Sequence, residues 1–116
     1  MTDRELVEAA AQAAGRKVTG WNIQQGEEVA VMEDGSFWQP LHMNRITNAD
    51  GDAFRLAVKL GIAVYPPEKP GDIATCNGPW PKSPWVYEDV LGDPYAATRR
   101  AIVRAAAALK RMESKE

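Results

Sequence analysis

The sequence predicts an α+β fold in which three helices pack on a small antiparallel β-sheet. Three segments repeat apolar residues at helical spacing, and short β-favouring runs lie between the first two of them. A length of 116 residues allows one substantial core and is too short for two. We therefore expect a single domain over residues 1–116.

The first helix is predicted from Thr2 to Ala14. Thr2 with Glu5 three residues later is typical of a capping box, and apolar residues then recur every three or four positions. Gly15 suits the position directly after a helix. The segment should therefore fold as an amphipathic helix with a defined start and end.

Residues 17–38 predict an antiparallel meander. The runs KVTGWNI, EEVAVM and SFW favour strands, and they are separated by QQG and EDG, of which the second is a hairpin signal. The later segment ADGDAFRLAVKLG predicts a second helix, because it begins with acids and ends before Gly61. Its apolar stripe consists of Ala53, Leu56, Ala57 and Leu60.

Residues 66–85 are expected to form an irregular loop rich in proline and tryptophan. IAVY before this loop and WVY at its end favour short strands, whereas proline and glycine dominate PPEKPGDIATCNGPWPKSP between them. Loops of this length are uncommon in compact domains and often carry binding residues. Contact with a ligand or a partner is therefore one role to consider for this loop.

The last helix is predicted to begin at Asp93, a good N-cap residue, with Pro94 at the first helical position. Large aliphatic side chains belong to its apolar stripe, so we expect this helix at the centre of the fold. The stripe consists of Tyr95, Ile102, Val103, Ala106 and Leu109.

Arg99, Arg100 and Arg104 belong to the same helix, and two interpretations of them stay open. They can form a solvated face whose stems cover neighbouring apolar surface. Alternatively, Arg99 and Arg100 work with aromatic side chains as a pocket for an anionic ligand or an acidic partner, because guanidinium groups bind phosphate and carboxylate well.

The tryptophans divide into two groups. Trp21 and Trp38 lie in predicted strands and are expected to pack against the helices. Trp80, Trp85 and Tyr87 lie in or beside the irregular loop, where they either form a stacking or interface surface or anchor the loop to the core. The candidate ligand- or partner-binding residues are Arg99, Arg100, Arg104, Trp38, Trp80, Trp85 and Tyr87.

Catalytic constellations are lacking. Cys76 is the one cysteine and His42 the one histidine, and the chain has no phosphate-cradling glycine motif. Asp50 and Asp52 are best explained as acids that favour a helix start, although a hydrolase using them and His42 around a metal is a third, minor hypothesis. We therefore expect no catalysis, no metal and no cofactor.

The charge balance bears on the compartment and the partners. A net charge of -2 and a pI near 5.4 give no overall field toward nucleic acid or an anionic membrane. The charged opening MTDRELVEAAAQAAG does not match a signal peptide, and no apolar run approaches the roughly 20 residues of a membrane span. We expect a cytoplasmic protein without membrane contact.

Three short motifs occur along the chain in this order: a tryptophan and a proline two apart, an acid followed by glycine, and a C-terminal helix with two alanines before an arginine. The residues of these motifs are Trp38 and Pro40, Asp50 and Gly51, and Ala96, Ala97 and Arg99. With these motifs, most of the chain resembles small phage and prophage accessory proteins of the NinX-like group. The resemblance implies a phage origin and a cytoplasmic accessory role in the bacterial host cell.

Together these observations predict a non-catalytic phage-encoded counter-defence factor. It would bind and block a host immune component, or sequester a small anionic, nucleotide-like signal. The alternative is a replication or genome-associated module that contacts nucleic acid or a replication protein through the basic last helix, which the net acidity disfavours. A homodimer or higher homo-oligomer is expected, because self-association would cover the tryptophan-bearing loop.

Overall fold

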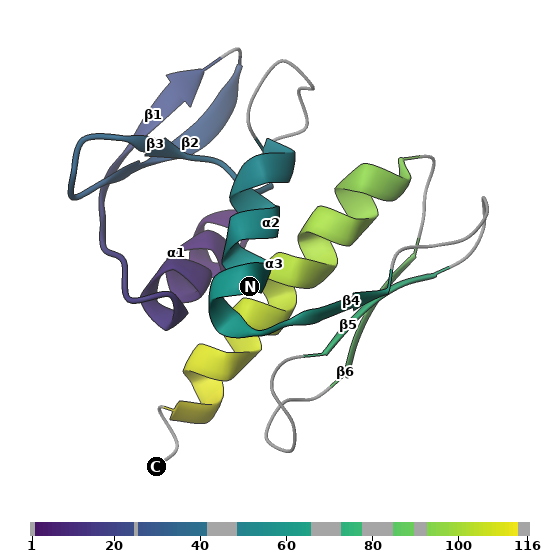
Figure 1. Ribbon diagram of the computed structural model, residues 1–116. Helices are drawn as coiled ribbons and strands as arrows, with labels where there is room; N and C mark the ends of the chain where they lie inside the picture. Colours follow the sequence, from purple (N-terminus) through teal and green to yellow (C-terminus); the bar gives the residue numbers. More distant parts are fainter. Residues whose placement is uncertain are drawn as a thin grey trace.

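The computed structural model describes residues 2–24, 26–41, 49–65, 73–77, 85–89 and 93–113, which form three helices and six strands (Figure 1). The predicted α+β class is confirmed. In chain order the elements are α1 (Asp3–Ala13), β1 (Val18–Gln24), β2 (Glu27–Met32), β3 (Phe37–Trp38), α2 (Ala49–Leu60), β4 (Ala63–Tyr65), β5 (Ile73–Asn77), β6 (Trp85–Asp89) and α3 (Pro94–Glu113).

The described strands form two separate antiparallel sheets, whereas the sequence predicted one. The first sheet has the order β1-β2-β3, with Trp21 opposite Ala30 and Ala30 opposite Trp38. The second sheet has the order β4-β5-β6, with Cys76 between Val64 and Val86. Figure 1 shows the two sheets on different sides of the helices. Along the chain, α2 lies between β3, which belongs to the first sheet, and β4, which belongs to the second.

The prediction of an irregular loop over residues 66–85 is wrong for residues 73–77, because these residues form β5, the central strand of the second sheet. Its partners come from both sides, since Thr75 lies opposite Tyr65 on β4 and Tyr87 on β6. Prolines and glycines around this five-residue run hide its strand character in the sequence. Pairing with two other strands supplies hydrogen bonds that the local sequence does not announce.

The two ends of α1 and the start of α3 have the capping residues that the sequence predicted. The Thr2 hydroxyl accepts from the Glu5 backbone N–H at 3.2 Å, and the Glu5 carboxylate accepts from the Thr2 backbone N–H at 3.3 Å, so the capping box is complete. Asp93 Oδ1 accepts from the backbone N–H of Tyr95 at 2.9 Å. Gly15 ends α1 with a φ of 73°, a conformation that favours glycine.

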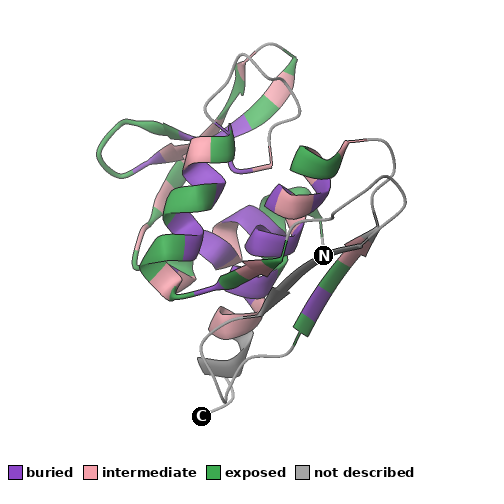
Figure 2. Ribbon diagram, turned by 45° about the vertical axis from the view of Figure 1, so that its right-hand side comes forward, coloured by how far each residue is buried: buried purple, intermediate pink, exposed green. Residues whose placement is uncertain are grey.

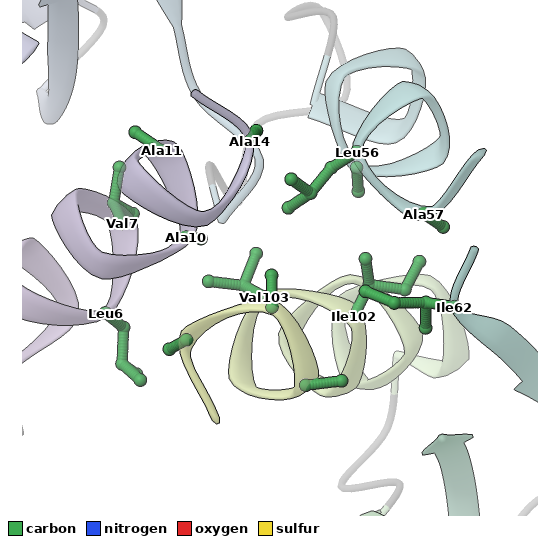
Figure 3. Close-up of a cluster of buried hydrophobic side chains, with 14 of the residues drawn as sticks. Leu6, Val7, Ala10, Ala11, Ala14, Leu56, Ala57, Ile62, Ile102 and Val103 are labelled. Carbon is green, nitrogen blue, oxygen red and sulfur yellow. The ribbon is translucent and has the colours of Figure 1, made fainter. Parts of the chain in front are cut away.

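The central helix is α3, as expected, and it packs against α1, α2, β5 and β6. Val103 lies between side chains from α1 and α2, while Ile102 faces Ile62 and α2 (Figure 3). Buried residues cover the sides of the helices that face one another (Figure 2). Neither α3 nor another helix of the described residues is long and apolar enough to cross a membrane.

Alanine forms much of the buried side of α3, where Ala101, Ala105 and Ala106 have no exposed surface. Such small side chains let neighbouring helices approach closely. The predicted stripe is right for Ile102 and Val103 and wrong for Tyr95, which is 61% exposed. Tyr95 lies in the first turn of α3, beside the groove described below, instead of in the core.

Candidate functional site

Arg99 is buried on α3 and reaches toward α2. Its side chain is 9% exposed, and its Nη1 donates to Asp50 Oδ1 at 2.5 Å, whereas the Asp50 side chain is 68% exposed. Among the described residues, nothing accepts a hydrogen bond from Arg99 Nε. The guanidinium therefore sits in a protected position with part of its hydrogen-bonding capacity unused.

Arg100 and Arg104 reach the other side of α3. Arg100 Nη1 donates to Asp3 Oδ1 of α1 at 2.9 Å, and Arg100 Nε lies 3.5 Å from a Glu88 oxygen on β6. Arg104 pairs with the same Glu88 and donates to the Tyr87 backbone oxygen at 2.9 Å. These two arginines connect α3 to α1 and to β6, and they do not join Arg99 in one pocket.

The same pairing extends to every arginine whose side chain the structure describes. Each such guanidinium lies within salt-bridge distance of a carboxylate of the same chain, so these arginines are paired within the protein. Arg100 and Arg104 remain 38% and 42% exposed, so they keep contact with solvent while they form these pairs. The pairs are Arg4–Glu28, Arg16–Asp34, Arg55–Asp52, Arg99–Asp50, Arg100–Asp3 and Arg104–Glu88.

The candidate aromatic residues that the structure describes lie in two separate places. Trp85 lies on β6 with its ring centre 5.7 Å from that of Tyr65, and Tyr87 lies on the same outer side of the second sheet. Trp38 is 4% exposed in the core, as its strand position predicted, with the Arg16 guanidinium 5.8 Å from its ring centre. Trp80 lies outside the described residues.

An apolar groove of about 750 Å³ lies between α2 and α3 and extends to β4. Buried Ala57 and Ile102 belong to its lining, while Phe54, Val58 and Tyr95 are 67%, 66% and 61% exposed there. The volume falls in the range of roughly 300–1,000 Å³ that small-molecule sites occupy. The groove is therefore large enough for a small ligand, and its exposed apolar side chains would become covered by one.

Arg99 and Asp50 also line this groove and give it a polar part. Of the binding residues that the sequence predicted, the groove contains Arg99, whereas Phe54, Val58 and Tyr95 were missed. A signal for two of them exists, because Phe54 and Val58 stand four positions apart outside the predicted stripe of that helix. Apolar residues on a second face of a helix indicate a second contact surface.

A smaller hollow of about 300 Å³ lies beside α1 and the first sheet. There the Arg4 guanidinium stands 4.9 Å from the Trp21 ring centre and donates to both oxygens of Glu28, at 3.0 and 3.1 Å. Trp21 Nε1 donates to Glu8 at 3.2 Å, which fastens the first sheet to α1. These contacts stabilise the packing of α1 on the first sheet.

Asp50 and Asp52, the two acids considered as metal ligands, each form an ion pair with an arginine. Asp52 is buried, accepts from the Gln39 backbone N–H at 3.0 Å and pairs with Arg55 at 2.7 Å. The described residues contain no group of three or more side chains of the metal-binding kind. His42 lies outside the described residues, so the metal hypothesis gains no support from this geometry.

The described residues thus offer two features for a candidate site. Ion pairs join α3 to α1, α2 and β6, and an apolar groove between α2 and α3 contains one buried arginine. Such a groove can bind a ligand, and the described residues that line it include no nucleophile next to a base. Compared with known protein families, with curated proteins and with solved structures, the chain shows no match.

Proposed function

We propose that this protein is a non-catalytic phage accessory protein that counters a host defence by binding, and that the groove between α2 and α3 is its binding site. One observation carries the choice of site: an apolar groove contains a nine-tenths buried arginine beside exposed Phe54 and Val58. A concave apolar site with few polar groups is typical of ligand binding. The phage origin and the counter-defence role rest on the sequence resemblance.

Of the two modes of action expected, sequestering a small anionic signal fits this groove better than covering the surface of a host protein. The hollow has the volume of a small-molecule site, and Arg99 supplies the positive charge. Blocking a host immune component through the exposed side chains of the same groove is the second mode. In both modes the protein acts in the cytoplasm of the infected cell.

The alternative of nucleic-acid binding through the last helix receives less support. Arg100 and Arg104 are both bound to Glu88, and Arg100 also to Asp3. A protein that neutralises phosphates needs cations that are free to replace counterions. The carboxylates beside these two arginines would repel a phosphate backbone.

The proposal is tested by phage plating on bacteria that carry defence systems and express the protein. The parent protein should raise plating efficiency on at least one defended strain. Phe54→Asp places a charge in the groove at a position that is 67% exposed, so the fold should survive and protection should be lost. Lys59→Ala, exposed on the same helix and not part of the groove lining, is the matched control and should protect like the parent.

Two results would contradict the proposal. Protection by Phe54→Asp equal to that of the parent, with both proteins folded by circular dichroism, would show that another surface is responsible. An absence of protection by the parent on every defended strain would remove the counter-defence role itself.

A further inference from the structure

We infer that the groove takes a small amphiphile with an apolar body and one anionic head group, and that this head group replaces the Asp50 carboxylate on Arg99. The inference rests on the proposed function in one respect, that the groove is a binding site. It adds the chemical class of the ligand and gives Asp50 the role of a resident counterion.

The first argument is the state of Arg99. Its guanidinium carries a positive charge, and its side chain is only 9% exposed. A buried charge needs an anion and hydrogen-bond acceptors, yet Nε has no acceptor among the described residues. Asp50 therefore leaves one buried N–H of the guanidinium without an acceptor, and an anion bound at Arg99 would offer an oxygen to it.

The two partners of the Arg99–Asp50 ion pair differ in burial. Asp50 is 68% exposed, so water can solvate its carboxylate when it leaves the guanidinium. Exposed carboxylates gain little from an ion pair, and exchanging one for another anion costs little. Another anion can therefore displace the exposed Asp50 carboxylate, whereas the buried Arg99 guanidinium stays in place.

Apart from Arg99 and Asp50, the groove offers a ligand mostly apolar surface. Its other walls are largely apolar, with Ala57 and Ile102 buried and Phe54 and Val58 exposed. Arg100, the next cation along the helix, is engaged by Asp3 and Glu88, so a second charge on the ligand would find no partner there. One anionic group on an apolar body fits this distribution better than a polyphosphate.

The experiment compares decanoate with 1-decanol by isothermal titration calorimetry, because the two probes share a ten-carbon body and differ in head-group charge. The parent should bind decanoate more tightly than decanol. Asp50→Asn removes the competing carboxylate, so decanoate affinity should rise by about two- to fivefold while decanol affinity stays unchanged. Lys59→Ala should leave both affinities unchanged.

Two further variants place the probe in the groove. Arg99→Met keeps a long side chain without the charge, and it should abolish the preference for decanoate over decanol. Ala57→Phe fills the hollow and should abolish binding of both probes. Circular dichroism and thermal melting of each variant separate lost binding from lost folding, and Asp50→Asn keeps the test decisive if Arg99→Met fails to fold.

The results distinguish this inference from the proposed function. Equal affinities for decanoate and decanol, or unchanged decanoate affinity in Asp50→Asn, overturn the role of the head group and leave the groove as a binding site. No measurable binding of decanoate overturns the inference, whereas the plating assay with Phe54→Asp still decides the proposed function. Undiminished protection by a folded Ala57→Phe variant would instead count against the groove itself.

Discussion

Arg99 and Arg100 are neighbours in the sequence, yet their guanidinium groups bind carboxylates on different helices. Arg99 reaches Asp50 of α2 at 2.5 Å, and Arg100 reaches Asp3 of α1 at 2.9 Å. Successive residues of an α-helix point about 100° apart, so α3 places one arginine on each side of itself. The pair therefore connects three helices instead of forming one basic patch.

This arrangement predicts unequal costs of removing the two side chains. Arg99→Ala should lower the free energy of unfolding by about 2 kcal/mol, because a buried stem and its ion pair are lost. Arg100→Ala should cost less than about 1 kcal/mol, because its side chain is 38% exposed and its ion pairs are largely solvated. Urea denaturation of both variants measures the difference. Equal costs would mean that the burial of Arg99 contributes nothing.

Glu88 should matter more than an ordinary surface acid. Its side chain is 20% exposed and lies against both Arg100 and Arg104. Glu88→Gln leaves two cations without their shared partner, so we expect a loss of about 1 kcal/mol in unfolding free energy. Glu28→Gln is the control and should cost less, because the Glu28 carboxylate is 49% exposed and pairs with Arg4. A smaller effect at Glu88 than at Glu28 would refute this reasoning.

The cap of α3 supplies a third prediction. Asp93 Oδ1 accepts from the backbone N–H groups of Tyr95 and Ala96, at 2.9 and 3.3 Å. Asp93→Ala should destabilise the protein by about 1 kcal/mol, whereas Asp93→Asn keeps an acceptor and should cost only a few tenths of a kcal/mol. Thermal melting checks both variants, and an unchanged melting temperature for Asp93→Ala would contradict the capping role.

The capping box at Thr2 and Glu5 predicts a pH dependence. Hydrogen bonds from the Thr2 backbone N–H, and then from its hydroxyl, hold the pKa of the Glu5 carboxyl below its usual value. Because the folded pKa is the lower one, this stabilisation is present above the unfolded-state pKa and is lost as pH falls through the folded pKa. Glu5→Gln, which keeps an acceptor without titrating, should be less stable than the parent at pH 7.

The difference between parent and Glu5→Gln should shrink as pH falls from about 5 to about 3. Urea midpoints at a series of pH values measure this difference.

A second carboxylate should behave in the same way. Hydrogen bonds from the Ser36 hydroxyl, and then from the Ser36 backbone N–H, lower the pKa of Asp34. Ser36→Ala, which removes the hydroxyl, should therefore also lose its effect in acid. If the stability difference between the parent and either variant stays constant over this pH range, the corresponding carboxylate does not contribute to the loss of stability in acid.

Self-association is the last prediction. Tyr65, Trp85 and Tyr87 are 52%, 49% and 57% exposed, and aromatic surface of this kind is commonly covered in an assembly. We expect a homodimer at micromolar concentration by sedimentation velocity. Trp85→Ser should shift it toward monomer, and Lys59→Ala should not. A monomeric parent would contradict the prediction.

Features that depend on residues a few positions apart were predictable from the sequence alone. Thr2 with Glu5, Asp93 with Pro94, and Gly15 were sufficient to define three helix ends, because capping groups bind backbone atoms within the same turn. The periodic stripes likewise predicted which segments become helices. These local interactions exist in any fold that contains the helix.

Features that need a partner far away in the chain depend on how the helices and strands pack. The central strand β5 exists because β4 and β6 pair with it on both sides, although its own five residues carry a weak signal between prolines and glycines. Arg99 became a groove residue because α2 brings Asp50, 49 positions away, beside it. Such contacts depend on how elements pack, and the spacing of residues along one segment contains no information about the side chains that another segment brings.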